Sequence, residues 1–339
     1  MIRKPELTVA IPAYNGSRHM REALRSVLSQ VGVCFDLVVC DDRSEDGTLD
    51  IVREFAGDRA RIEVNSERLG LAENWNRCVS LSQTEWVAIF HQDDLMKPWH
   101  LAVTLNAIDQ AKDIPLGFVA GDTETIDDEG HPVDPSVVDP GGNIIPARGP
   151  YALRVTTFDP GSFTDFLIGR NPLRCSAVTL NRNAHADVGG FDPHYRYIVD
   201  WEFWLRIARR RGVVWRSGDP SVLVRWHPRS ETHRFKASTD DLDETARLLG
   251  RISAEDLPGH PQRRAERRKA DRRLARAFLN RALDALHAGR VDLARDCLSR
   301  GVRLRPALLG MIASDPRLAG QMLTLAVMPG LAKRLFSKN

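Results

Sequence analysis

The first 120 residues alternate short apolar runs with amphipathic stretches, and this rhythm limits most strongly what the chain can fold into. We expect strands at residues 7–11, 35–40, 61–64 and 86–90, with helices between them at 18–30, 48–55 and 72–81. Strands that alternate with helices of this length predict a parallel sheet covered by helices. Ligands of such sheets bind at the carboxyl ends of the strands, so the polar residues there are the first candidates for a site.

The rhythm breaks at residues 122–160, which are rich in Pro, Gly and Asp. We expect a long surface excursion there, with the composition of a flexible lid. Regular structure resumes in a strand at 176–180, a helix at 200–210 and a strand at 221–226 that closes the body. From about Asp240 the sequence is almost entirely helix-forming, and residues 275–306 resemble one tetratricopeptide-like hairpin.

Charge separates an acidic body from a basic tail. Lys and Arg number 25 against 32 Asp and Glu up to residue 227, and 23 against 13 from residue 228 on. The five cysteines are odd in number and scattered, which argues against a zinc cluster or a disulfide framework and suits a reducing cytoplasm. We expect no signal peptide, and the longest late apolar run, 322–332, is about half of a bilayer span. These features predict a cytoplasmic protein, at most peripheral at the inner face of the plasma membrane.

Acidic clusters follow two of the expected strands and open a later helix. Asp41-Asp42 follows the second strand, Asp93-Asp94 the fourth, and Asp200 begins the helix at 200–210. Adjacent carboxylates repel one another unless a cation or a donor neutralises them, and Mg²⁺ commonly binds one or two carboxylates plus substrate phosphates. Asp46 and Asp200 have an alternative interpretation as helix N-caps, which the pair after the fourth strand lacks. The sequence contains no P-loop and no GxGxxG, which argues against P-loop hydrolysis and the usual dinucleotide enzymes.

Taken together, these segments resemble the family 2 glycosyltransferases of the GT-A fold over residues 7–230. The motifs that carry the resemblance are Pro12-Ala13-Tyr14-Asn15, Asp41-Asp42-Arg43-Ser44 with Asp46-Gly47-Thr48, Gly70-Leu71-Ala72 with Asn76, Asp93-Asp94, Val188-Gly189-Gly190-Phe191-Asp192, and Asp200-Trp201-Glu202-Phe203-Trp204-Leu205-Arg206. The resemblance implies an α/β nucleotide-diphospho-sugar transferase fold, a Rossmann-like mixed sheet flanked by helices, over residues 1–235. Residues 1–120 would bind the nucleotide sugar, residues 121–235 the acceptor, and 236–339 would form a basic helical C-terminal region.

The resemblance also implies roles for individual residues on the donor side. Tyr14 would stack on a pyrimidine, and Asp42 would accept a hydrogen bond from its ring N–H. The residues expected to bind the nucleotide are Pro12, Ala13, Tyr14, Asn15, Asp42, Gly70, Asn76 and Asp93. Asp94 would bind Mn²⁺ or Mg²⁺, and Asp93 the ribose or a metal-bound water; His91 stands where the common DxDD form has its first acidic residue. His227, after the last expected strand, has two interpretations, a metal ligand or a surface group that contacts phosphate.

On the acceptor side, the family transfers sugars by a single displacement that inverts the anomeric carbon. The attacking hydroxyl must lose a proton, which requires a positioned carboxylate. Asp200 occupies the place of the family's base, with Val199 where the family often has Glu, and Trp201 and Glu202 would bind the acceptor. A divalent ion that bridges the phosphates would stabilise the leaving diphosphate.

We therefore expect a metal-dependent inverting glycosyltransferase that uses a UDP- or dTDP-sugar and a polysaccharide or glycolipid acceptor. The rival hypothesis is a non-catalytic nucleotide-sugar-binding or scaffold protein that acts through its helical tail, but a scaffold has no need of Asp93, Asp94 and Asp200. A nucleotidyltransferase would carry a Gly-rich basic loop after the first strand, which PAYNGS does not supply.

The basic tail has a stripe of arginines at helical spacing, Arg264, Arg268, Arg272 and Arg276. It is interpreted as a solvated helix face or as a surface for anionic lipid head groups. Stacking aromatics are missing and acidic residues interrupt the charge, so we expect no nucleic-acid partner.

Overall fold

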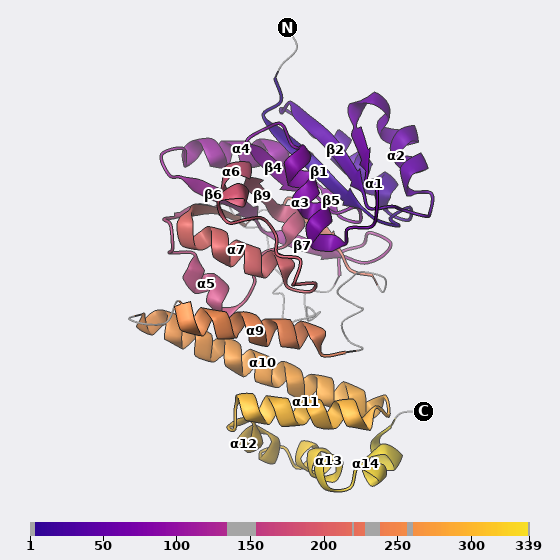
Figure 1. Ribbon diagram of the computed structural model, residues 1–339, viewed down its shortest axis with the longest axis vertical. Coiled ribbons are helices and arrows are strands. Elements are labelled where there is room, and N and C mark those ends of the chain that lie inside the picture. The colour runs from indigo at the N-terminus through magenta and orange to yellow at the C-terminus, as the bar shows by residue number, and fades with distance from the viewer. Residues whose placement is uncertain (1–3, 134–153, 219, 228–237, 256–259, 338–339) are drawn as a thin grey trace. The chain divides into compact units, whose positions relative to one another are not determined.

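The computed structural model describes residues 4–133, 154–218, 220–227, 238–255 and 260–337. The chain divides into two compact units (Figure 1). The first comprises Met1–Val137, Ile145–Leu167 and Asn171–Pro228, and the second Val138–Ile144, Ile168–Arg170 and Arg229–Asn339. Residues 134–153, which hold most of the excursion expected at 122–160 and its candidate lid, lie outside the described residues.

An eight-stranded sheet with the order β3-β2-β1-β4-β9-β6-β10-β8 forms the centre of the first unit. Its strands are β1 Leu7–Ala13, β2 Phe35–Asp41, β3 Arg61–Val64, β4 Trp86–Ile89, β6 Leu116–Gly121, β8 Arg154–Phe158, β9 Val178–Asn181 and β10 Gly212–Ser217. The first four strands are parallel, as the alternating pattern predicts. β9 runs antiparallel between β4 and β6, and β8 runs antiparallel to β10. The sheet is therefore mixed, which confirms the expected fold class.

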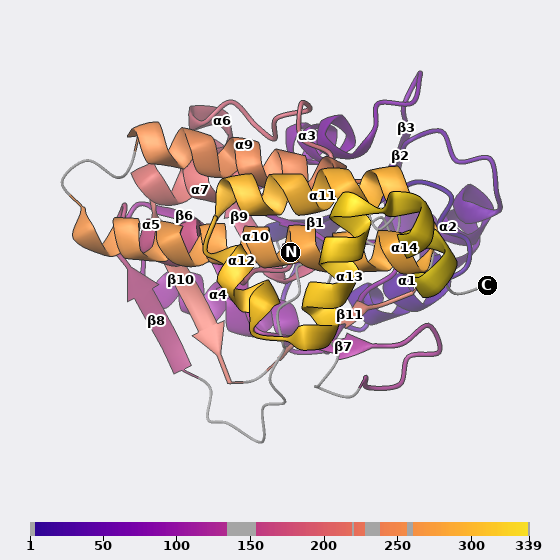
Figure 2. The ribbon, with the colours of Figure 1, turned by 90° about the horizontal axis from the view of Figure 1, so that it is seen from below.

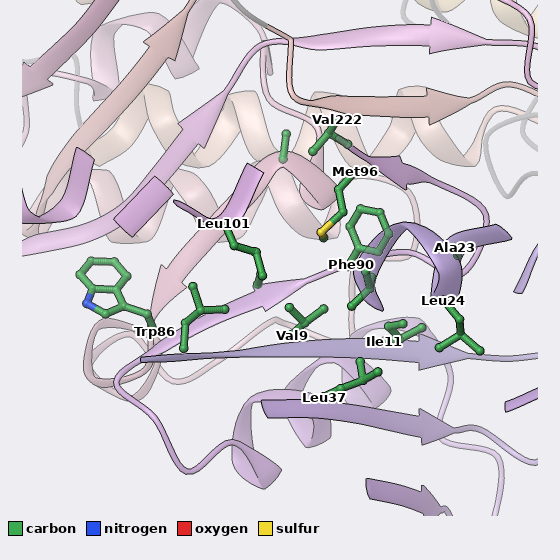
Figure 3. Packing of buried hydrophobic residues seen from close by; sticks show 14 of the residues in the cluster. Val9, Ile11, Ala23, Leu24, Leu37, Trp86, Phe90, Met96, Leu101 and Val222 are labelled. Carbon is green, nitrogen blue, oxygen red and sulfur yellow. The ribbon is translucent and has the colours of Figure 1, made fainter. Parts of the chain in front are cut away.

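Helices cover both faces of this sheet. They are α1 Met20–Leu28, α2 Thr48–Ala56, α3 Leu71–Leu81, α4 His100–Gln110, α5 Thr164–Gly169, α6 Arg182–Asp187 and α7 Val199–Arg210, with short 3₁₀ turns at Gly57–Arg59 and Cys175–Ala177. Alternate residues of β1 point to opposite faces. Val9 and Ile11 pack with Leu24 of α1 in one core cluster (Figure 3). Thr8 faces the other side, where its hydroxyl lies 2.8 Å from that of Thr84.

A smaller sheet has the order β5-β11-β7, and its strand β5 follows β4 in the chain. β11 Val222–Arg225 pairs antiparallel with β5 Leu95–Met96 and parallel with β7 Thr123–Ile126. The prediction of a continuous surface excursion over 122–160 is therefore wrong at both ends, because 123–126 and 154–158 are strands. Both strands find their partners about 60 to 100 residues away in the chain, and local composition carries no signal of such pairing.

The second unit is helical, as the sequence predicts. Its described helices are α9 Asp240–Glu255, α10 Pro261–His287, α11 Val291–Leu304, α12 Leu308–Ala313, α13 Pro316–Val327 and α14 Pro329–Phe336. α10 and α11 form the expected hairpin (Figure 2). Gly289 turns the chain between them with a φ of 71°, which favours glycine. The arginines of the stripe, Arg264, Arg268, Arg272 and Arg276, are all exposed. No helix within the described ranges has both the length and the apolarity to cross a bilayer.

Candidate functional site

The loops that follow β1 and β2 are locked to each other by hydrogen bonds. The Asn15 amide N–H donates to Oγ of Ser44 (2.9 Å), and the N–H of Glu45 donates to Oδ1 of Asn15 (2.8 Å). Asn15 and Arg43 have φ angles of 46° and 66°, which non-glycine residues rarely adopt. Such backbone persists only where surrounding contacts hold it in place, and it is concentrated at functional sites. Pro12 and Ala13 are the last residues of β1 and pair with Cys40 and Asp41 of β2.

Gln92 joins the loop after β1 to the acidic segment after β4. Its side-chain amide accepts from the N–H of Tyr14 and donates to the carbonyl of Tyr14, both at 3.0 Å. A Cβ on Gly16 would lie 2.1 Å from Oε1 of Gln92, so glycine at this position lets the amide approach. Sequence reasoning missed Gln92, whose only signal is its position directly before the acidic pair.

Tyr14 has a cationic neighbour. The guanidinium carbon of Arg68 lies 3.9 Å from the centroid of the Tyr14 ring, within the range of a cation–π contact. A pyrimidine that stacks on Tyr14 must share the ring with Arg68 or displace it.

Asp42 shapes the loop before α3. Its buried carboxylate accepts from the N–H groups of Leu69 (2.7 Å) and Gly70 (2.8 Å) and from Nδ2 of Asn65 (2.9 Å). Gly70 has a φ of 86° and is the N-cap of α3, a conformation that favours glycine. Since a carboxylate has about four acceptor sites, one site remains for the ring N–H that we expect Asp42 to bind.

Asn76 is engaged within the protein. Its Nδ2 donates to the carbonyl of Phe191 (2.9 Å), while its Oδ1 accepts from the N–H of Phe191 (2.7 Å) and lies 2.9 Å from Nε2 of His185. These contacts attach α3 to the Gly189-Gly190-Phe191 turn, and they do not support the nucleotide-binding role predicted for Asn76.

The two carboxylates after β4 have different environments. Asp94 is 2% exposed, with Oδ2 2.5 Å from Oγ of Ser176 and Oδ1 accepting from the N–H of Arg225 (2.8 Å). Burial, and then the charge of Asp93, raise the pKa of Asp94 to about 8. Burial also acts to raise the pKa of Asp93, but the hydrogen bond from His227 and the charge of His91 outweigh it, so this pKa lies below its usual value. Nε2 of His227 lies 3.0 Å from Oδ2 of Asp93.

Arg225, which the sequence analysis did not single out, holds the acidic segment against β11. Its side chain is buried, and Nε donates to the carbonyl of Asp93 (2.9 Å). The same guanidinium donates to the carbonyl of Asp128 (2.7 Å) and to Oε2 of Glu22 (2.6 Å). A buried arginine with this many acceptors fixes the backbone from which Asp93 and Asp94 project.

Two groups of side chains within the described part of the chain have the donors for a metal ion. One is His91, Asp93 and Asp94, and the other is His19, Asp128 and His227, with ligand atoms within 4.8 Å of one another in each group. Nε2 of His91 is buried without a hydrogen-bond partner, and burial lowers the pKa of His91, which keeps the imidazole neutral and able to bind a metal. Imidazole together with carboxylates fits Mn²⁺. The residues present therefore fit a divalent cation, and His91 is a candidate ligand that sequence reasoning left out.

Asp200 is the second residue of α7, whose N-cap is Ile198, so its interpretation as an N-cap is wrong. Its carboxylate accepts from the N–H of Trp201 (2.7 Å) and from Nδ2 of Asn171 (2.9 Å). A helix N-terminus favours the ionised form of a carboxylate, but burial outweighs this effect, the two donors and Arg174, and it raises the pKa of Asp200 above its usual value. A carboxylate with a raised pKa is a stronger base.

Asp200 belongs to the same electrostatic environment as the carboxylate pair. The pKa of His91 responds to the charges of both Asp93 and Asp200, and that of the Cys175 thiol to both Asp94 and Asp200. The structure thus brings together two groups that lie more than 100 residues apart in the chain.

Trp201 and Glu202, predicted to bind the acceptor, are both buried. Nε1 of Trp201 donates to the carbonyl of Leu167 (2.7 Å). The Glu202 carboxylate is 2% exposed and accepts from Nε (2.8 Å) and Nη2 (2.7 Å) of Arg206. Arg206 also donates to the carbonyl of Gly190 (2.7 Å), which ties α7 to the glycine turn. These contacts do not support acceptor binding by the two side chains.

Comparison with known proteins identifies a family for the first part of the chain. Residues 8–152 match the family described as glycosyl transferase family 2. Residues 8–152 therefore carry a glycosyl transferase family 2 domain. This domain and the glycosyltransferases among its relatives support an enzyme of glycosyl transfer.

Its relatives in sequence differ in how much of their length it covers. It is 28% identical over 262 residues to MT1568 of Mycobacterium tuberculosis, an uncharacterized protein, covering 77% of this chain and 80% of that protein. It is 35% identical over 100 residues to the putative glycosyltransferase EpsE of Bacillus subtilis, and 30% identical over 130 residues to chondroitin synthase of Escherichia coli. These two matches cover 29% and 38% of this chain, and the chain spans only 36% and 19% of the two relatives.

Solved structures share the fold of this glycosyltransferase. TarS residues 1–349 of S. aureus in complex with UDP-GlcNAc align with a TM-score of 0.59 and 15% identity, over 90% of this chain and 92% of that one. The mannosyltransferase PcManGT of Pyrobaculum calidifontis, in complex with GDP-Man and Mn²⁺, aligns with a TM-score of 0.54 and 19% identity, over 98% and 87%. At these identities the likeness shows the GT-A fold alone.

Proposed function

We propose that this glycosyltransferase transfers a sugar from a UDP- or dTDP-sugar to a hydroxyl of a polysaccharide or glycolipid intermediate, with inversion at the anomeric carbon and with a divalent metal ion. The observation that carries the proposal is the pair Asp93–Asp94 after β4, with Asp94 buried and Asp93 half-buried, in electrostatic contact with Asp200 through His91. A scaffold protein has no use for three carboxylates in this arrangement, because their mutual repulsion costs stability.

The names of two relatives support the donor and acceptor classes. WfgD of Escherichia coli, 29% identical over 89 residues, is named as a glucosyltransferase that takes UDP-Glc and a diphosphoundecaprenol-linked sugar. The TarS complex contains UDP-GlcNAc. PcManGT binds GDP-Man on the same fold, so the choice of a pyrimidine rests on Tyr14 and Asp42 and is open to direct measurement.

On the donor side, Asp94 and Asp93 would hold Mn²⁺ or Mg²⁺, with His227 and His91 as the neighbouring imidazoles. The ion supplies positive charge that stabilises the diphosphate as the bond to the sugar breaks. Arg225 keeps the acidic segment in place for this contact, and Gln92 connects the segment to Tyr14, where the base would stack.

On the acceptor side, Asp200 takes the proton of the attacking hydroxyl. The acceptor oxygen forms a bond to the anomeric carbon while the nucleoside diphosphate leaves from the opposite face, which inverts the configuration. Asn171 holds one oxygen of Asp200 and the N–H of Trp201 the other, so both donors orient the base.

Two substitutions test the proposal. Asp94→Ala should weaken calorimetric binding of UDP in the presence of Mn²⁺, and Asp200→Asn should leave that binding intact while turnover falls about 10²–10⁴-fold. Asp109→Asn, an exposed carboxylate on α4, is the matched control and should change neither quantity. Normal turnover in Asp200→Asn would overturn the assignment of the base, and wild-type protein that binds UDP without any turnover over a broad acceptor set would favour the scaffold hypothesis.

For the whole chain we propose residues 1–235 as the catalytic domain, 236–339 as a helical C-terminal region, and a cytoplasmic location. The arginine stripe of α10 alternates with acidic residues that pair with neighbouring bases, such as Glu266 with Lys269 (2.6 Å) and Asp271 with Arg267 (3.0 Å). Such pairing favours a solvated helix face over a nucleic-acid surface.

A further inference from the structure

Exposed aliphatic side chains gather at the C-terminal end of the second unit. Half of the large hydrophobic residues that are exposed within the described part of the chain lie between residues 309 and 335. Five of them lie on α13, on α14 or at the junction of these helices, and together we call them the C-terminal apolar face: Leu323, Val327, Met328, Leu331 and Leu335.

These residues are not part of the core of the helical unit. In α13 the core positions are Met322 and Leu325, which are 3% and 0% exposed, whereas Leu323 and Val327, one turn apart, are 66% and 67% exposed. Residues four apart lie on one face of a helix.

α14 repeats this arrangement. Ala332 is fully buried, while Leu331 and Leu335, again one turn apart, are 40% and 61% exposed. The two helices pack against each other within the unit, as both ribbon views show (Figures 1 and 2). The outward residues of both helices are surplus to what the unit needs for its own packing, and a cluster of this kind marks an interaction surface.

The charge carried by α13, α14 and the residues that follow them has one sign. No acidic residue follows Asp315 in the sequence, whereas Arg317, Lys333, Arg334 and Lys338 do follow it, so residues 316–339 carry four basic and no acidic side chains. Lys333 and Arg334 are exposed and lie between Leu331 and Leu335. Neither has an ion pair within the described part of the chain. Apolar residues interleaved with bases complement a surface that is apolar beneath and anionic on top, which is the chemistry of an anionic lipid membrane.

We propose that the C-terminal apolar face docks on anionic lipid membranes. Leu323, Val327, Leu331 and Leu335 enter the boundary between head groups and acyl chains, while Lys333 and Arg334 contact the anionic head groups. α13 has 12 residues and α14 has 8, so both lie in the interface and neither spans it. The membrane contact itself needs neither donor nor acceptor. Its link to catalysis rests on the proposed function, because the enzyme would meet a lipid-linked acceptor at the membrane surface.

This surface differs from the arginine stripe of α10. Arg268 and Arg272 are exposed, but no large hydrophobic residue of α10 is exposed beside them. Because no apolar side chains lie beside it for insertion, we do not assign this stripe to the membrane contact. The two surfaces therefore predict different results when apolar and basic residues are exchanged separately.

Sedimentation of the full-length chain with large vesicles tests the proposal, with phosphatidylcholine alone or mixed with phosphatidylglycerol. We expect binding to the mixed vesicles. Leu331→Gln with Leu335→Gln should reduce the partition coefficient at least tenfold, by loss of apolar burial. Lys333→Gln with Arg334→Gln should reduce it about 25-fold, from about fivefold for each base, and only on the anionic vesicles.

Three controls separate the alternatives. Val31→Gln removes an apolar side chain that is 58% exposed on the first unit, Arg268→Gln with Arg272→Gln removes two stripe arginines, and Asp200→Asn removes the proposed base. All three should bind vesicles as the wild type does, and circular dichroism should show unchanged helix content in every variant.

Several outcomes would overturn the proposal. They are no binding to anionic vesicles, loss of binding in the Arg268/Arg272 variant instead of the Leu331/Leu335 variant, or a wild-type dimer that becomes monomeric in Leu331→Gln with Leu335→Gln by light scattering. The last result would assign the face to a second copy of the chain. Failure of vesicle binding with intact turnover would overturn the membrane contact and leave the proposed function standing. Protein that binds vesicles but shows no turnover would support the membrane contact and contradict the proposed function.

Discussion

Replacing Arg206 should destabilise the first unit, because Arg206 neutralises a buried carboxylate. In this ion pair the Glu202 side chain is 2% exposed and that of Arg206 18%, and two nitrogens of the guanidinium contact the carboxylate. Arg206→Met leaves Glu202 buried without its counter-charge and removes a donor from the carbonyl of Gly190.

The size of the effect follows from this burial. Removing one partner of a buried pair costs about 3–5 kcal/mol, and the partial exposure of Arg206 favours the lower end, about 3 kcal/mol. For a domain of this size that corresponds to a decrease of about 6–12 °C in Tm. Exchanging both partners, Glu202→Gln with Arg206→Met, should recover at least half of the loss, because no charge remains buried.

Urea denaturation followed by tryptophan fluorescence measures these differences, since Trp201 and Trp204 lie on the same helix as the pair. Arg53→Met is the matched control: its pair with Asp50 on α2 is exposed and should contribute less than about 1 kcal/mol. A loss below 1 kcal/mol in Arg206→Met would refute the reasoning. Glu202→Gln that folds normally but abolishes turnover would show that Glu202, and not Asp200, is the base.

Three further predictions concern the base, a buried histidine and the domain boundary. Asn171→Ala removes a donor that lowers the pKa of Asp200, so the acidic limb of the pH profile of kcat/KM should move to higher pH; an unchanged limb would contradict the role of Asp200. Burial, and then the charge of Arg206, lower the pKa of His185 to about 4. The unfolded state therefore binds more protons than the folded state below pH 6.5, and the free energy of unfolding should fall by about 3 kcal/mol between pH 6.5 and 4. The urea midpoint should show this slope, and His185→Gln should flatten it. A chain that ends at residue 235 should bind UDP with unchanged affinity in calorimetry, and a folded truncation that fails to bind would show that the proposed domain boundary is misplaced.

Local sequence patterns determined the elements whose signal is short-range. The apolar runs that become β1 to β4, and the helices between them, have their periodicity written over a few residues, so they are predicted within one or two residues at most ends. The position of Asp42, Asp93 and Asp94 at strand ends follows from the same patterns, because parallel strands present their carboxyl ends at one edge. The order of these motifs is enough to indicate the family.

Tertiary structure decided what depends on pairing across long stretches of chain. β9 inserts antiparallel between β4 and β6, and β11 joins β7, about 100 residues before it, so that Arg225 and His227 reach Asp93. No local propensity encodes such a register, since strand pairing is set by contacts with distant neighbours.

Burial separates the roles of side chains that look equivalent in the sequence. Asp200 and Glu202 are two residues apart on α7, yet Asp200 is held by hydrogen-bond donors with its pKa raised, whereas Glu202 is enclosed with Arg206. The sequence alone determined that a carboxylate would lie at the start of this helix. The desolvation of both carboxylates, and the Asn171 donor that reaches Asp200 from 29 residues away, are properties of the folded state only.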